Sequence, residues 1–140
     1  MAVLGLTLGR IAWSDITRRI VPNRDIALVA IFGLINLLTK EPSIAEWLDR
    51  LVVLVGFGLV LLGLFATGKL GGGDVKLMLT APLWLAPVDI IPFIVLLSLG
   101  GALVAIGTLV MMRLGYHKQP GVPYAVAICA ALIFLVVRAY

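Results

Sequence analysis

Residues 90–112 read IIPFIVLLSLGGALVAIGTLVMM, an apolar run without a charged side chain. About 20 apolar residues in a helix are enough to cross the hydrocarbon core of a bilayer. Residues 47–67 form a second run of this kind, interrupted only by an Asp-Arg pair near its start. These two runs predict membrane-spanning helices and an all-α integral membrane protein.

The composition of the whole chain favours the same class. Hydrophobic residues make up 62% of its 140 residues and charged residues 13%, and the mean hydropathy is +1.17. A soluble domain carries about 25% charged residues, so we expect lipid to surround most of this chain. The net charge of +4 comes without a basic stripe or stacking aromatic residues, and we therefore expect no nucleic-acid partner.

Proline- and glycine-containing connections divide the chain into six apolar segments. We expect a single transmembrane domain over residues 1–140, built as a bundle of six short transmembrane helices. The fourth segment is short and contains Pro82, so it either crosses a locally thinned bilayer or enters the bilayer without crossing; the first interpretation is preferred. The segments are about 1–16, 25–40, 47–67, 74–86, 90–112 and 122–138.

Basic side chains concentrate in alternate connections between these segments. The positive-inside rule places such connections in the cytoplasm. Asp15, beside the first connection, and Asp74, at the end of the third, therefore fall on the same cytoplasmic side. The basic residues of these connections are Arg18, Arg19, Arg24, Lys69, Lys76, Arg113 and Lys118.

These two acidic residues at the membrane edge are the candidate catalytic groups. Asp15 lies near the end of the first expected helix, where the helix dipole disfavours a carboxylate and where an ionisable group is costly and usually functional. A salt bridge to Arg18 or Arg19 is the structural alternative. Asp74 follows residues 71–73, three glycines. It would serve as an ordinary helix cap, but the glycines also leave bare backbone that an extended peptide can approach.

Two neighbouring carboxyl groups suit peptide hydrolysis. At close range the two groups cannot readily be ionised at the same time, so one of them keeps a proton. The ionised member takes a proton from water, and the protonated member polarises the scissile carbonyl. Because Asp74 opens a helix, we expect it to be the base and Asp15 the acid, within a pair that titrates as a unit.

The stretches DITRRIVPN at 15–23 and GGGDVKL at 71–77 resemble the two signature segments of the type IV prepilin peptidases. A looser likeness is the sequence VPYA at 122–125. The resemblance implies a membrane-embedded aspartyl peptidase of the GxGD type, with Asp15 and Asp74 catalytic and no cofactor or metal. The residues that match the motifs around them, and that we expect to bind substrate or support the site, are Gly71, Gly72, Gly73, Lys76, Pro22 and Asn23.

The same resemblance implies the substrate and the location. The substrates would be prepilins or pseudopilins, which carry a short basic leader followed by a hydrophobic helix, cut at the cytoplasmic face of the bacterial inner membrane. Lys76 is expected either to steady Asp74 or to hold a lipid headgroup, with a slight preference for the first. Larger family members have a cysteine-rich zinc insertion and methylate the product. This chain has one cysteine, Cys129, and therefore resembles the short, peptidase-only form of tight-adherence (Flp) pilus systems.

Other functions remain open at this level. The two carboxylates would also serve as an ion relay in a small transporter or channel subunit, or hold a divalent cation with few ligands. A relay needs polar groups spaced across the bilayer, whereas both Asp residues are expected on one side. A related preflagellin or presenilin-like peptidase is a further alternative. The single histidine, His117, is placed in a polar connection, and a histidine-dependent mechanism is not expected.

Overall fold

The computed structural model describes residues 2–68, 70–115 and 122–139, and over these residues the chain is all-α. The expected all-α fold is thus confirmed; Lys69, His117 and Lys118 lie outside the described residues. The elements in chain order are α1 (Ala2–Arg18), α2 (Asn23–Leu38), α3 (Ile44–Ala66), α4 (Gly72–Met78), α5 (Ala81–Trp84), the 3-10 turn η1 (Pro87–Asp89), α6 (Ile90–Arg113) and α7 (Tyr124–Ala139).

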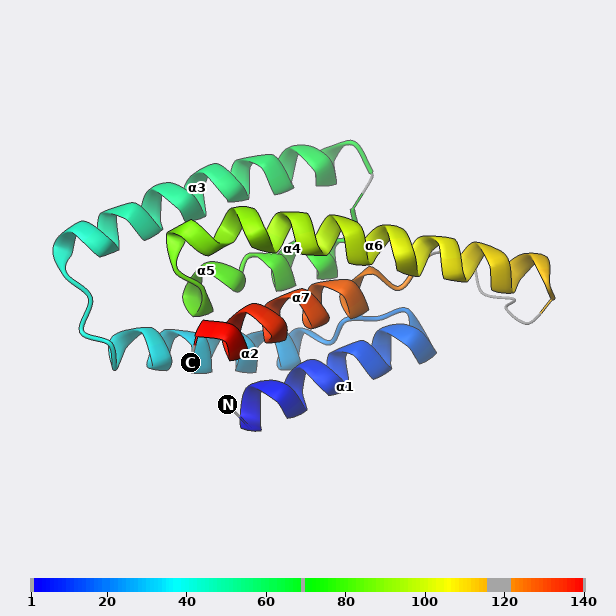
Figure 1. Ribbon diagram of the computed structural model, residues 1–140, viewed down its shortest axis with the longest axis horizontal. Helices are drawn as coiled ribbons and strands as arrows, with labels where there is room; N and C mark the ends of the chain where they lie inside the picture. Colours follow the sequence, from blue (N-terminus) through cyan, green and yellow to red (C-terminus); the bar gives the residue numbers. More distant parts are fainter. Residues whose placement is uncertain (1, 69, 116–121, 140) are drawn as a thin grey trace.

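The helices lie roughly along one long axis, and both termini are at the same end of the bundle (Figure 1). The last helix, α7, packs between α1 and α6 and also contacts α4. On its inner face, Ala125, Ile128 and Leu132 are fully buried. The last helix in the chain is therefore at the centre of the packing.

Local sequence explains where α1 ends and α2 begins. Helix α1 ends at Arg18, and Arg19 then adopts a left-handed backbone with a φ of 55°. Pro22 is extended and comes directly before α2, and its carbonyl oxygen accepts the N–H groups of Asp25 and Ile26. Proline disfavours helical geometry at the residue before it, so the chain turns between α1 and α2.

The fourth apolar segment differs from the expected continuous helix over 74–86. It forms two short helices, α4 and α5, with the break at Leu79 and Thr80 and with Pro82 in the first turn of α5. Pro82 has no N–H to continue the helical ladder. From 72 to 84 the pair would extend about 20 Å at 1.5 Å per residue, less than the roughly 30 Å of a hydrocarbon core.

Hydrogen bonds to α3 and α2 fix the end of α5. Nη1 of Arg50, in α3, donates to the carbonyl oxygens of Pro82 at 2.9 Å and Leu85 at 2.7 Å. Nε1 of Trp84 donates to the carbonyl oxygen of Val29 at 3.0 Å. A Cβ atom at Gly33 would lie 2.6 Å from that indole nitrogen, so only glycine lets α2 approach here.

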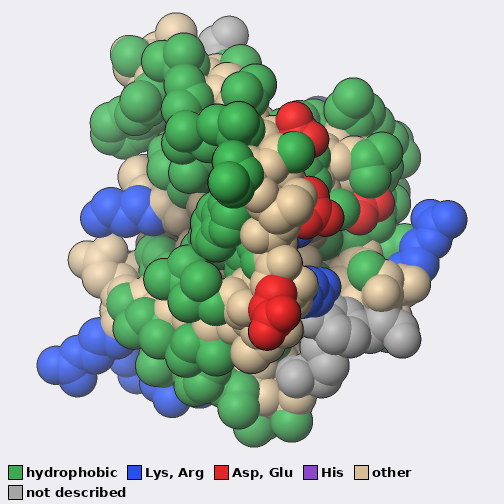
Figure 2. Space-filling model, turned by 90° about the vertical axis from the view of Figure 1, so that its left-hand side faces the viewer, with side chains coloured by type: hydrophobic (Ala, Val, Ile, Leu, Met, Phe, Trp, Pro, Cys, Tyr) green, Lys and Arg blue, Asp and Glu red, His purple; other side chains and the backbone are tan. Residues whose placement is uncertain are grey.

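Apolar side chains cover much of the outer surface. Within the described residues, Ile44–Ala66 and Pro87–Arg113 are long and apolar enough to cross a membrane. Large side chains on both point outward: Val52, Leu59 and Val60 in α3, and Ile91 and Leu103 in α6, are each more than half exposed. The end of the bundle that lies on the left in Figure 1 carries apolar side chains with several acidic side chains among them (Figure 2).

Candidate active site

Asp15 is buried at the end of α1 and is held by the start of α7. Its side chain is 7% exposed, and Oδ2 accepts a 3.0 Å hydrogen bond from the main-chain N–H of Ala125. The first N–H groups of a helix have no partner inside that helix, and the N-terminal end of the dipole favours a negative charge. Burial disfavours the charged form of Asp15, whereas the hydrogen bond from Ala125 and the positive charge of Arg19 favour it. The sequence placed Asp15 at an unfavourable helix end, but α7 supplies the compensating contact.

Asp74 is the third residue of α4 and is half-buried. Its carboxyl lies close enough to Asp15 for the two charges to interact. It also folds back over its own loop, because a Cβ atom at Gly71 would lie 3.1 Å from Oδ2 of Asp74. The structure thus brings together the two acidic residues that the sequence singled out.

Two contacts join the loop before α2 to the start of α4. A Cβ atom at Gly73 would lie only 3.0 Å from Cβ of Val21, so the glycine allows the two segments to meet. Nζ of Lys76 donates a 3.2 Å hydrogen bond to Oδ1 of Asn23. Lys76 thus links the two sequence motifs through Asn23, and its role toward Asp74 or a lipid headgroup stays a prediction.

Cys129 lies on α7 beside the two acidic residues. The thiol is buried, and the charges of both Asp15 and Asp74 act on it. It also contacts the backbone of Ala12 in α1. The sequence indicated only a buried apolar residue; burial is confirmed, but the closeness to the acidic pair depends on how α7 packs and has no signature in the sequence.

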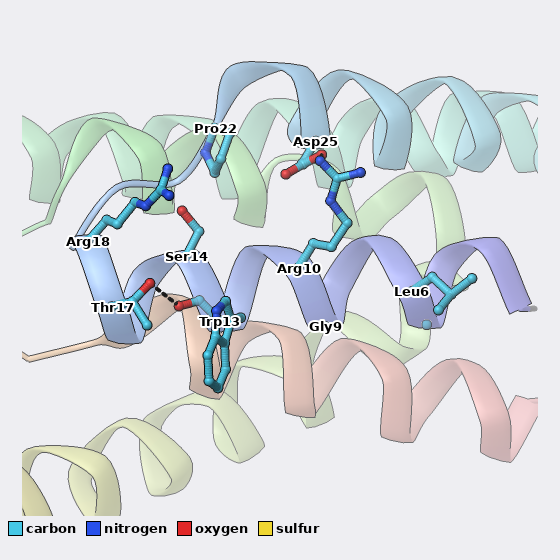
Figure 3. A pocket seen from close by; sticks show the side chains of 10 residues that line it. Leu6, Gly9, Arg10, Trp13, Ser14, Thr17, Arg18, Pro22 and Asp25 are labelled. Atoms are coloured by element: carbon cyan, nitrogen blue, oxygen red, sulfur yellow. Dashed lines mark hydrogen bonds and ion pairs between the residues drawn. The ribbon is translucent and has the colours of Figure 1, made fainter.

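A groove between α1 and α2 carries a further acidic residue that the sequence analysis did not select. Asp25 is 4% exposed, and its Oδ1 lies 3.4 Å from Nη2 of the exposed Arg10. The groove has a volume of about 840 Å³ and is bordered by Trp13 and Arg18 (Figure 3). Asp15 faces α7 instead, so this ion pair belongs to the α1–α2 contact and not to the acidic pair.

A family model described as the type IV leader peptidase family matches residues 2–106. The chain belongs to the type IV leader peptidase family. No curated protein and no solved structure matches it.

The type IV leader peptidase match includes both acidic residues and both loops that hold them. It ends within α6, so α7 lies beyond it. A leader peptidase site built from Asp15 and Asp74 would nevertheless depend on α7, because that helix supplies the N–H of Ala125. In the part of the chain that the structure describes, no group of three or more His, Cys, Asp or Glu side chains is arranged to hold a metal ion.

Proposed function

We propose that this leader peptidase is an intramembrane aspartyl endopeptidase that removes the leaders of type IV prepilins or Flp-type pilins. The observation that carries the proposal is the convergence of Asp15 and Asp74 where α1, α4 and α7 meet. Two carboxyl groups at such a place form the acid and base that amide hydrolysis by water requires. Among the other motif residues, Gly73 and Lys76 hold the two loops together, Gly73 against Val21 and Lys76 through Asn23.

The hydrogen bond from Ala125 supports Asp15 as the ionised member of the pair. A main-chain N–H at a helix start stabilises a carboxylate more than a carboxylic acid. Asp74, which senses the charge of Asp15, would then keep the shared proton. This assignment is the reverse of the one expected from the sequence, which considered the N-terminus of α4 but not that of α7.

The reaction then balances without a cofactor. Asp15 takes one proton from water while the water oxygen bonds to the carbonyl carbon. Asp74 gives its proton to the carbonyl oxygen. The resulting diol collapses as Asp15 passes its proton to the amide nitrogen and Asp74 recovers a proton from one hydroxyl. The C–N bond breaks, and the carboxyl pair returns to its starting state.

The surface supports a membrane location for this chemistry. The outward apolar faces of α3 and α6 suit lipid. The ends of α1 and α6 lie toward the right in Figure 1, and these helices end at Arg18 and Arg113. Arg24 is in the first turn of α2, which follows α1. By the positive-inside rule this end of the bundle, which holds the acidic pair, would face the cytoplasm of the bacterial inner membrane.

Co-expression with a candidate prepilin tests the function. We expect leader removal by the wild type and by Asp49→Ala, an exposed acidic residue at the start of α3. We expect no removal by Asp15→Ala or Asp74→Ala at matched protein levels. Cleavage that survives either of these substitutions would refute the aspartyl mechanism.

A further inference from the structure

An apolar cleft lies between α3 and α6, next to α4. Both helices contact η1, and Phe57 of α3 meets Phe93 of α6 edge to face, with ring centroids 6.4 Å apart. Beyond this contact the two helices diverge toward the end of the bundle that holds the acidic pair (Figure 1). The space between them has a volume of about 370 Å³, and its lining includes Leu61, Leu64, Met78, Ser98, Ala102 and Tyr124.

The inner end of the cleft borders the candidate active site. Met78 is one helical turn beyond Asp74 in α4. The ring of Tyr124 packs against Gly101, where an added Cβ atom would lie 3.0 Å from Cε1. Tyr124 directly precedes Ala125, the residue that donates to Asp15. The inner end of the cleft therefore lies one helical turn from Asp74 and directly beside the residue that precedes the donor to Asp15.

The α6 wall of the cleft suits a helix as its occupant. Ser98 and Ala102 are four residues apart, both are exposed, and both line the cleft. The hydroxyl of Ser98 donates to the carbonyl oxygen of Ile94 at 2.7 Å, within its own helix. In lipid, small residues at this spacing let a second helix backbone approach closely. The α6 wall thus allows close packing, and the hydroxyl of Ser98 is already hydrogen-bonded within its own helix.

We propose that this cleft receives the apolar helix that follows the scissile bond of the substrate, and so delivers that bond to Asp15 and Asp74. The inference rests on the proposed function, because it takes the substrate to be a leader joined to a hydrophobic helix. The helix descends between α3 and α6, and the leader extends past α4 toward the basic end of the bundle. The cleft thereby selects for a long apolar segment, while the acidic pair cuts next to it.

Cleavage of two synthetic peptides tests this selection. The long peptide has a basic leader and an apolar helix of about 20 residues; the short peptide ends a few residues after the cut. Ala102→Phe fills the cleft, and Ala27→Phe places the same bulk on an exposed site of α2 outside it. We expect Ala102→Phe to raise KM for the long peptide about tenfold or more, as excess bulk does in an apolar pocket. The short peptide should be cut as by the wild type, and Ala27→Phe should behave as the wild type on both.

Equal losses on both peptides, or no loss on the long one, would overturn the inference. A wild-type chain that cuts neither peptide would count against the proposed function instead, and a second measurement then decides on the cleft. A photoreactive leucine at position 64, which keeps the bulk of the native lining residue, in an Asp74→Asn background, should crosslink to the long peptide, and one at the exposed position 28 of α2 should not. Adducts at position 64 with lipid alone, unchanged by excess long peptide, would exclude the substrate helix as the occupant.

Discussion

The main-chain N–H of Ala125 and the carboxylate of Asp15 form a 3.0 Å hydrogen bond between residues 110 positions apart. The contact joins the last turn of α1 to the first turn of α7. It fixes one carboxyl of the acidic pair and favours the charged form of Asp15, which burial opposes. In the proposed mechanism, the position of α7 therefore determines which carboxyl accepts the proton of water.

Removing only this N–H should slow the reaction. Replacing Ala125 by lactic acid turns its amide into an ester, which keeps the side chain and deletes the donor. A hydrogen bond to a charged group contributes about 1.5–3 kcal/mol, so we expect kcat to fall by roughly one to two orders of magnitude. The same replacement at Ala127, also buried in α7, is the matched control and should leave kcat nearly unchanged. Equal effects at the two positions would show that the contact merely supports the helix.

Gly73 should be sensitive to a single methyl group. In Gly73→Ala the new Cβ meets Cβ of Val21 at 3.0 Å, and overpacking of this kind costs about 1–3 kcal/mol. We expect kcat/KM to fall about tenfold because α4 and Asp74 are pushed away from the loop before α2. The double variant Gly73→Ala/Val21→Ala should recover much of this loss. Gly63→Ala, where nothing lies within 4 Å, is the control, and failure of the Val21 rescue would contradict the explanation.

Arg50 should matter for stability and not for catalysis. Arg50→Met removes the hydrogen bonds to the carbonyl oxygens of Pro82 and Leu85, and we expect a loss of about 2 kcal/mol. The measurement is Tm in detergent, with cleavage per folded molecule recorded beside it. Arg138→Met, at the exposed end of α7, should change neither quantity. A drop in specific activity without a drop in Tm would place Arg50 in the function of the site.

Several features of the fold could be predicted from the sequence because they depend on local patterns. The apolar runs gave the helices now seen as α2, α3, α6 and α7, and Pro22 marked the turn after α1. The break inside 74–86 was less accessible, because Pro82 is tolerated in the first turn of a helix and the break also depends on what Arg50 and Trp84 bind. Local sequence patterns thus indicate that a segment is helical, whereas the break of residues 74–86 into two helices depends on tertiary contacts.

For the candidate site, too, the sequence predicted the acidic residues but not their hydrogen-bond partners. The motifs around Asp15 and Asp74 identified the acidic pair, since their residue types and spacing are unusual. The donor to Asp15 is a backbone N–H, which any residue at position 125 except proline would provide, and so the sequence carries no sign of it. The hydrogen bond from Lys76 to Asn23, 53 positions away, was likewise not predicted from the sequence. Partners across helices become visible only with the packing of the bundle.

The pH dependence of kcat/KM for the purified chain, with a leader peptide as substrate, tests the central claim most directly. One shared proton between Asp15 and Asp74 predicts a bell-shaped profile: the rate rises as the pair loses its first proton and falls as it loses the second. Asp15→Asn and Asp74→Asn should each abolish cleavage, while Asp49→Asn should keep the full profile. A rate that is independent of pH across both limbs, or a profile that persists in either of the first two variants, would contradict the account.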